Sequence, residues 1–211
     1  QKMALLDNLF KETYIRDIAS RNKVRNVGEM ETLLNILASA IGSLTNPNKL
    51  QKTFKSVNQS KITATTITKY IEYLEDSFLI EEAKRFDIKG KSYIGTPMKY
   101  YFMDMGLRNA RLNFRQMEVT HSMENVIYNE LRKRGYRVDV GNIMIVEPGK
   151  NGKPVKKQLE VDFICSKGSK KYYIQSAYSL ETEEKMAQEI RPFTKINDSF
   201  KKIVITSNTP K

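Results

Sequence analysis

Two stretches, QLEVDFIC at residues 158–165 and KYYIQSAY at residues 171–178, decide the fold. Apolar and polar side chains alternate along the first stretch, which predicts a strand with Glu160 and Asp162 on one side, roughly 7 Å apart. The turn KGSK between the two stretches predicts an antiparallel hairpin. We expect this hairpin to bring Gln175 beside Asp162, although the sequence does not fix the register of the strands.

The segments around this hairpin alternate between helical and strand patterns. Those expected in the second half of the chain are a helix at 123–134, strands at 136–140 and 143–146, a helix at 181–196 and a strand at 202–206. Ser122 is suited to cap the first of these helices, which places Glu124 in its first turn, where a carboxylate also suits the helix dipole. Helices interleaved with strands predict an α/β unit with a mixed sheet.

The first half of the chain is predicted to be helical, followed by a two-stranded ribbon. The expected helices span 3–21, 29–44, 49–57 and a segment from Thr63 or Thr65 to 78, and the expected strands span 79–86 and 99–103. The last three of these helices, followed by the ribbon, match the plan of a winged helix, in which the segment ending at 78 is the third helix. The apolar stripe of the first helix must be covered, either within this chain or by a further N-terminal domain.

A winged helix suggests contacts with nucleic acid, because its third helix enters the major groove and its ribbon contacts the backbone. The lysines suited to contact phosphates are Lys61, Lys69, Lys89 and Lys91. Glu72, Glu75 and Asp76 on the expected third helix oppose this interpretation, since negative charge repels phosphate. Such units also dock proteins, so both DNA and a protein remain candidate partners.

The amino-acid composition limits which binding partners and which cellular compartment we expect. The chain has 36 Lys and Arg against 24 Asp and Glu, a net charge of +12, which favours polyanions. The single cysteine, Cys165, excludes an internal disulfide and a cysteine metal cluster. No apolar run approaches the roughly 20 residues that span a bilayer and no signal peptide is visible, so we expect no membrane partner and a reducing cytoplasm. The sequence GKS at 90–92 is no nucleotide site, because Arg85 stands where a Walker A motif needs glycine.

Four stretches carry a resemblance to a known family. They are MENVIYNEL at 123–131, EVDF at 160–163, YIQSAYSL at 173–180 and KIVIT at 202–206. They resemble the C-terminal region of bacterial and archaeal AAA+ ATPases that carries the DUF4143 domain. The resemblance implies a P-loop ATPase domain N-terminal to this chain, and any ATP would bind there. It divides the chain into a trailing helix (1–28), a winged-helix-like domain (29–115) and a degenerate PD-(D/E)xK nuclease-like domain (116–211), which would be restriction-endonuclease-like.

The resemblance also implies a degenerate nuclease site. Glu124 matches the helix acid of the nuclease pattern, Asp162 the metal-binding Asp, and Gln175 the Glu or Gln of the final motif. The Lys expected two residues beyond Gln175 is Ala177. Asp162 and Gln175 could hold Mg²⁺ or Mn²⁺ weakly, but phosphodiester hydrolysis also needs charge stabilisation, which Ala177 does not supply.

Several functions follow from this site. We expect a non-catalytic regulatory module that binds DNA or a protein as the C-terminal part of a AAA+ ATPase. One alternative is a metal-dependent nuclease whose lysine is relocated to Lys171 or Lys185. Another is a purely structural domain for assembly. A structural origin of the polar residues also remains open, with Glu124 complementing the helix dipole and Asp162 lying on a solvated strand face.

Overall fold

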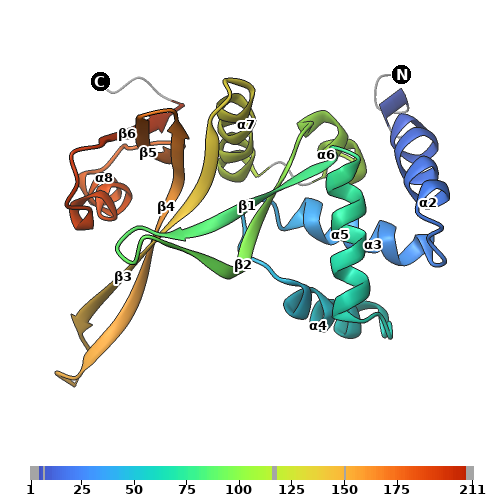
Figure 1. The fold of residues 1–211 in the computed structure, drawn as a ribbon, viewed down its shortest axis with the longest axis horizontal. Helices are drawn as coiled ribbons and strands as arrows, with labels where there is room; N and C mark the ends of the chain where they lie inside the picture. The colour runs from blue at the N-terminus through green and yellow to red at the C-terminus, as the bar shows by residue number, and fades with distance from the viewer. Residues whose placement is uncertain (1–4, 7, 116–117, 150, 208–211) are drawn as a thin grey trace. The chain divides into compact units, whose positions relative to one another are not determined.

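The computed structural model describes residues 5, 6, 8–115, 118–149 and 151–207. In these ranges the protein has seven α-helices and one six-stranded sheet of order β2-β1-β3-β4-β5-β6 (Figure 1). The β1–β3 and β5–β6 pairs are parallel, whereas β3–β4 and β4–β5 are antiparallel. The predicted α/β class, with a helical N-terminal unit followed by a mixed sheet, is confirmed.

The elements follow the expected order with shifted bounds. They are η1 (Leu9–Ile15, a π-helix), α2 (Arg16–Arg21), α3 (Val27–Ser39), α4 (Pro47–Asn58), α5 (Ala64–Asp76), β1 (Ile80–Asp87), β2 (Ser92–Phe102), α6 (Met105–Arg111), α7 (Val119–Lys133), β3 (Arg137–Pro148), β4 (Pro154–Lys167), β5 (Lys170–Ala177), α8 (Glu183–Ile190), η2 (Phe193–Lys195, a 3₁₀ helix) and β6 (Lys201–Thr206). No helix within the described ranges is long and apolar enough to cross a membrane.

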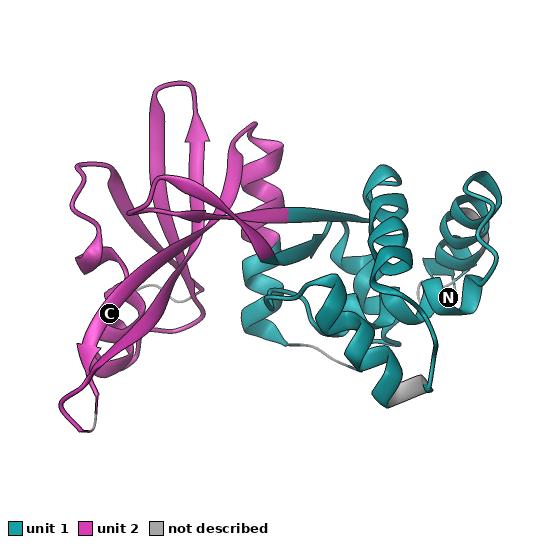
Figure 2. Cartoon of the chain, turned by 60° about the horizontal axis from the view of Figure 1, so that its bottom comes forward, with its two compact units in different colours: residues 1–82, 97–125 teal, residues 83–96, 126–211 magenta. Residues whose placement is uncertain are grey.

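The chain forms two compact units (Figure 2). Unit 1 comprises residues 1–82 and 97–125, and unit 2 comprises residues 83–96 and 126–211. The boundary therefore falls inside β1, β2 and α7. The three-part division drawn from the sequence stays a prediction.

Unit 1 is a helical core whose helices α3, α4 and α5 begin at polar N-cap residues, of which Thr63 was one of the two caps predicted for α5. The side chain of Asn26 caps α3, that of Asn46 caps α4 just before Pro47, and that of Thr63 caps α5 by accepting the N–H of Thr66 at 3.2 Å. Because these polar residues satisfy orphan N–H groups, they fix where the helices begin. The buried side chains of α3 and α5 then meet in one core, which contains Leu33, Leu34, Leu37, Ile67, Ile71 and Leu74.

The N-terminal helix is covered in part within unit 1, since Leu5 and Leu9 stay 67% and 42% exposed. Phe10, Ile15 and Ile18 are buried in the same core as α3 and α5. Residues 3, 4 and 7 of the expected 3–21 helix lie outside the described residues. Packing inside the chain thus accounts for the buried part of the apolar stripe.

Two arginines on α6 fasten that helix to α3. Arg108, which is fully buried, donates from Nε to the carbonyl oxygen of Ala38 at 2.9 Å. Arg111 forms an ion pair with Glu31 at 2.9 Å and donates to Asn35. The Arg108 contact satisfies a carbonyl in the last turn of α3, where intrahelical donors run out.

Unit 2 places helical segments on both faces of the sheet. Tyr128 of α7 contacts Phe163 of β4 on one face, with ring centroids 6.1 Å apart. On the other face, Phe193 and Ile196 at η2 pack with Ile164 and Tyr173. The helix expected at 181–196 ends at Ile190, shortly before Pro192, which cannot donate a helical hydrogen bond.

Two expected bounds around α7 and β3 were wrong. α7 begins at Val119, not after Ser122, so Glu124 lies in its second turn and not beside the dipole terminus. The strands expected at 136–140 and 143–146 form the single strand β3, whose pairing with β4 shifts register between Asp139 and Gly141.

Candidate functional site

Asp162 lies in a β-bulge. Asp139 pairs with Ile164 and Gly141 pairs with Val161, so three residue steps on β4 oppose two on β3. The extra residue interrupts the strict alternation of side chains at this point of β4. Bulges often re-aim a side chain next to a functional site, so this is where a specific role for Asp162 would be expected.

The hairpin does bring Gln175 beside Asp162, as predicted. The last regular β4–β5 pair is Phe163 with Ile174. Beyond it, the Ser176 N–H donates to Asp162 Oδ2 at 2.8 Å and the Asp162 N–H donates to Gln175 Oε1 at 3.4 Å. Both side chains are buried, 7% and 9% exposed. They therefore continue the β4–β5 pairing with side-chain hydrogen bonds where the backbone ladder has stopped.

Sequence reasoning missed the third polar residue of this cluster. Gln175 Nε2 donates to Glu189 Oε2 on α8 at 3.3 Å. Lys185 lies four residues earlier on α8, on the same helical face. The sequence pattern of α8 shows that the helix is charged and amphipathic, but it does not reveal which of its three carboxylates faces β5.

The residues at Asp162 do not fit a divalent metal ion. Gln175 Oε1 and Asp162 Oδ2 each already accept a backbone N–H group. Mg²⁺ binds through oxygen ligands in near-ideal octahedral geometry, which needs such oxygens turned toward one point. Within the described part of the chain, no group of three His, Cys, Asp or Glu side chains is placed to hold a metal.

The lysine missing from position 177 is not replaced by Lys171. Ala177 is buried, 3% exposed. The Lys171 Nζ lies over the rings of Phe86, Tyr173 and Phe200, at 5.7, 5.4 and 5.3 Å from their centroids. Lys171 also precedes Gln175 by four residues, roughly 13 Å along a strand. Its charge is thus committed to cation–π contacts away from Asp162.

Glu124, the third residue of the expected site, belongs to unit 1 and has its own partners there. Lys99 Nζ forms an ion pair with Glu124 Oε1 at 2.9 Å, and the Tyr101 hydroxyl donates to the same oxygen at 2.5 Å. The neighbouring Asn125 exchanges two hydrogen bonds with the backbone of Phe102, at 2.7 and 2.8 Å. Glu124 therefore anchors α7 to β2, and Asp162 and Gln175 lie in the other unit.

The four lysines expected to contact DNA are all exposed, but they are divided between the units. Lys61 and Lys69 belong to unit 1, whereas Lys89 and Lys91 belong to unit 2. The latter two lie in the β1–β2 turn, where Asp87 Oδ1 accepts the N–H groups of Lys89 and Gly90, each at 3.1 Å. The Asp87 carboxylate orders this turn and so fixes the backbone that carries both lysines.

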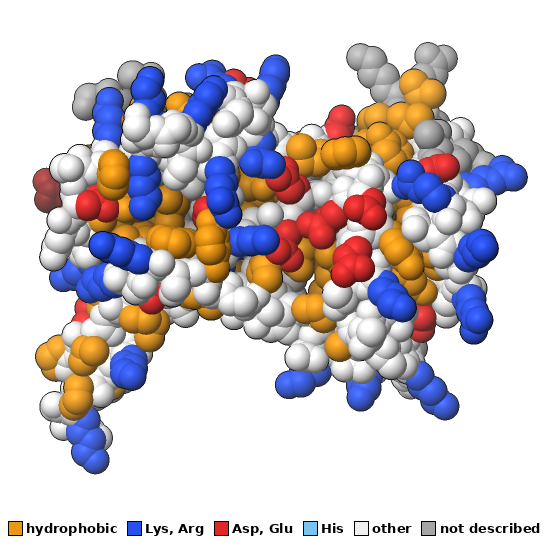
Figure 3. Space-filling model, viewed as in Figure 1, with side chains coloured by type: hydrophobic (Ala, Val, Ile, Leu, Met, Phe, Trp, Pro, Cys, Tyr) orange, Lys and Arg blue, Asp and Glu red, His pale blue; other side chains and the backbone are white. Residues whose placement is uncertain are grey.

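Acidic side chains gather over α5 and the start of β1 (Figure 3). Burial, reinforced by the nearby charge of Glu82, raises the pKa of Glu75 to about 7. Asp76 and Glu81 raise it further. The expected recognition helix thus carries a concentration of negative charge, which disfavours its approach to phosphates.

The comparisons with known proteins identify a family. A family model described as Domain of unknown function (DUF8612) matches residues 1–118, more than half of the chain. The chain belongs to the DUF8612 family. The DUF8612 match includes all four lysines expected to contact DNA and ends before Glu124, Asp162 and Gln175.

Two relatives extend the similarity over nearly the whole chain. A Haemophilus influenzae protein named only as uncharacterized is 32% identical over 205 residues, 97% of this chain and 47% of its own length. The uncharacterized protein MJ1544 of Methanocaldococcus jannaschii is 30% identical over 194 residues, 92% of this chain and 40% of its own length. The chain thus spans less than half the length of these relatives. No solved structure matches it significantly.

The expected resemblance to the DUF4143 domain was wrong. The matching model is DUF8612, and neither relative is described as an ATPase. Short stretches of strand and helix pattern, such as EVDF and KIVIT, recur in many α/β proteins and do not separate one family from another. The ATPase and nuclease functions implied by that resemblance lose this support.

Proposed function

We propose that this chain is a nucleic-acid-binding module that contacts phosphates through unit 2 and does not cut them. The observation that carries the proposal is the distribution of charge. Unit 2 contains 21 Lys and Arg against 11 Asp and Glu, whereas unit 1 contains 15 against 13. Nearly all of the basic surplus is therefore in unit 2, and counterion release makes such a surplus attractive to nucleic acids.

The projecting part of β3 and β4 is the surface best suited to this contact. Hydrophobic and basic side chains lie side by side on it (Figure 3). Met144 and Val146 of β3 are 43% and 64% exposed, and Lys153 and Lys156 are exposed at the start of β4. A two-stranded ribbon of this kind fits the major groove, and apolar side chains on it can contact bases. Lys157 contributes less, because it is paired with Glu147 at 2.9 Å.

The proposal shifts the contact from the expected third helix to the sheet. The acidic cluster around Glu75 weakens the case for α5, whereas Lys153 and Lys156 form no ion pair with any acid that the structure describes. Lys89 and Lys91 on the β1–β2 turn are further cations of the same unit. A protein partner, an assembly role and a cytoplasmic location stay predictions.

Duplex binding over a salt series tests the proposal. We expect Lys153→Glu with Lys156→Glu to weaken binding about tenfold or more near 0.1 M salt and to lower the slope of log K against log salt by about 2. The matched control is Lys61→Glu with Lys69→Glu, the same change of charge in unit 1, which should alter affinity less than threefold. Equal losses in both variants, or no binding by the unmodified chain at low salt, would contradict the assignment.

Incubation with plasmid separates binding from cleavage. We expect no cleavage in Mg²⁺ or Mn²⁺, because the oxygens at Asp162 are held by backbone donors. The Asp162→Ala variant should give the same result as the unmodified chain. Metal-dependent cleavage that disappears in this variant would show that the relocated-lysine nuclease is the correct function.

A further inference from the structure

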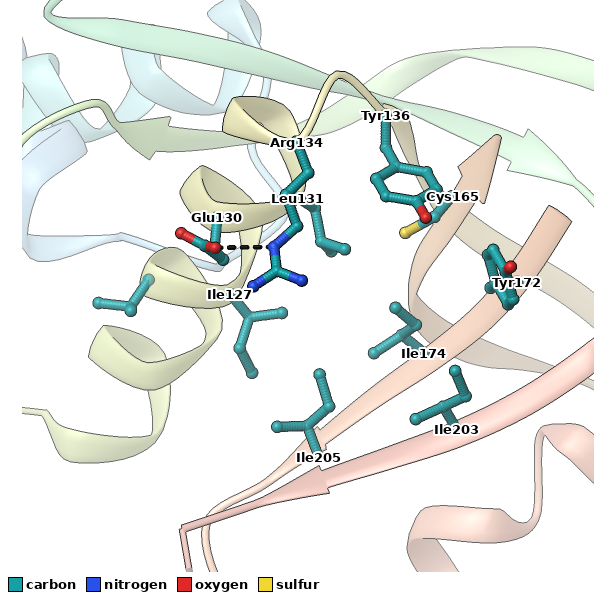
Figure 4. Close-up of a pocket in the computed structure, with 11 residues that line it drawn as sticks. Ile127, Glu130, Leu131, Arg134, Tyr136, Cys165, Tyr172, Ile174, Ile203 and Ile205 are labelled. Atoms are coloured by element: carbon teal, nitrogen blue, oxygen red, sulfur yellow. Dashed lines mark hydrogen bonds and ion pairs between the residues drawn. The ribbon is translucent and has the colours of Figure 1, made fainter. Parts of the chain in front are cut away.

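A cavity of about 430 Å³ lies within unit 2, between α7 and the sheet (Figure 4). Ile127 and Leu131 line it from α7, and Ile174, Ile203 and Ile205 line it from β5 and β6. Cys165 of β4 forms a fully buried part of the wall, and burial raises the pKa of its thiol to about 12. The wall is therefore apolar and uncharged over most of its area.

The cavity exists because α7 does not close onto β6. Ile203 and Ile205 on β6 are only partly buried, and Val126 on the facing helix is 55% exposed. Apolar cavities of about 300–1,000 Å³ are typical of small-molecule sites. The volume of this cavity therefore suits a small-molecule ligand.

Arg134 and Glu130 line the mouth of the cavity as an ion pair, with side chains 67% and 49% exposed. Arg134 Nε donates to Glu130 Oε1 at 2.7 Å, which fixes the orientation of the guanidinium (Figure 4). Its two terminal nitrogens make no hydrogen bond to any residue that the structure describes. The Lys167 Nζ also donates to the Arg134 carbonyl oxygen at 2.6 Å, which holds the backbone at the end of α7. The terminal nitrogens therefore remain for a ligand, in the fork geometry that suits a carboxylate.

We propose that this cavity binds a small amphipathic carboxylate, with its carboxylate on Arg134 and its apolar body among the isoleucines of β5 and β6. The terminal N–H donors of Arg134 suit a carboxylate, and the apolar wall suits a hydrocarbon chain or ring. At about 30 Å³ for each water-sized group, the volume admits roughly 14 heavy atoms. A straight-chain carboxylate of eight to ten carbons meets both requirements. The inference is independent of nucleic-acid binding.

Octanoate and 1-octanol form a matched pair of probes, because they share the chain and differ in the charged head. Titration followed by methyl NMR signals of Ile174, Ile203 and Ile205 reports where they bind. We expect octanoate to bind about tenfold more tightly than octanol. Arg134→Gln should remove that preference and leave octanol unchanged, whereas Lys133→Gln, the neighbouring exposed cation outside the cavity, should leave both affinities unchanged.

A variant with a larger side chain inside the cavity tests whether the probes bind against its apolar wall. Ile205→Phe should weaken both probes at least tenfold. If that variant does not fold, Val126→Trp serves instead, since Val126 is half exposed and the chain has no other Trp. Its fluorescence should respond to octanoate in a saturable way. Equal affinity for octanoate and octanol, equal effects of the Arg134 and Lys133 variants, or no shift of the three isoleucine signals would each overturn the proposal.

Discussion

The Lys99–Glu124 pair shows how a residue suited to catalysis can serve structure instead. Both side chains are buried, 4% and 10% exposed, and the Tyr101 hydroxyl shares the Glu124 oxygen. Gly42 has a φ of +71°, and a Cβ there would lie 3.2 Å from Glu124 Oε2, so both its conformation and the close carboxylate favour glycine. Burying charges costs free energy that only good geometry and further hydrogen bonds offset. Each partner therefore depends on the other.

Lys99→Met should destabilise the protein by about 3 kcal/mol, because it leaves the Glu124 carboxylate buried without its cation. Adding Glu124→Leu to the same chain should recover part of that loss. The free energy of unfolding in urea measures both effects. Lys69→Met, an exposed lysine on α5, is the control and should change stability by less than about 0.5 kcal/mol. A loss no larger than this control would show that the buried pair contributes nothing.

Glu75 should make stability depend on pH. Its pKa is raised to about 7 in the folded protein, against 4.5 as its ordinary value, first by burial and then by the charge of Glu82. The folded state thus binds the extra proton between these values, so the free energy of unfolding falls as pH rises from about 4.5 to 7. The loss is on the order of 1 to 2 kcal/mol after solvent screening.

Glu75→Gln should remove this dependence and raise stability at pH 8, because the amide oxygen can still accept the Glu82 N–H that Glu75 accepts at 3.0 Å. Urea unfolding at pH 5 and pH 8 measures the difference. Glu72→Gln on the same helix is the control and should keep the slope of the unmodified protein. A slope that survives in the Glu75 variant would assign the pH dependence to another group.

At the scale of elements, the starts of α3, α4 and α5 were predicted to within two residues, whereas the start of α7 and the bulge in β4 were not. Asn26, Asn46 and Thr63 each cap a helix by a local hydrogen bond, a relation that spans three residues and is visible in the chain. The bulge at Asp162 depends on how β4 pairs with β3, whose residues lie about 20 positions away. Such a register follows from packing across strands, which no local pattern records.

The close packing around Gly141, beside this bulge, predicts that a larger residue there will destabilise the protein. A Cβ there would lie 2.8 Å from Val161 Cβ and 3.0 Å from Ile88 Cδ1. We therefore expect Gly141→Ala to lower the free energy of unfolding by about 1–3 kcal/mol through overpacking. Gly95→Ala is the matched control, because a Cβ at Gly95 meets nothing within 4 Å. It should be neutral or slightly stabilising through reduced unfolded-state entropy. Urea unfolding compares the two, and equal effects would contradict close packing at Gly141.

At the scale of the whole molecule, the basic surplus was evident from composition but its location was not. The division into units assigns most of it to unit 2, whereas the winged-helix interpretation directed attention to α5. The neighbourhood of Asp162 and Gln175 was predictable because a short hairpin joins their strands. Glu189 and the cavity beneath α7 were not, since both depend on how a distant helix packs against the sheet.

Because β6 lies at the end of the sheet order, it is an edge strand through which the chain could aggregate. An edge strand offers its backbone groups to any similar strand, and the IVIT sequence at residues 203–206 has the β-branched character of aggregation-prone segments. Lys201 and Lys202 precede it directly and act as gatekeepers, because charges at an edge oppose stacking of identical strands. At high salt this protection is screened, so concentrated samples should be handled at low ionic strength.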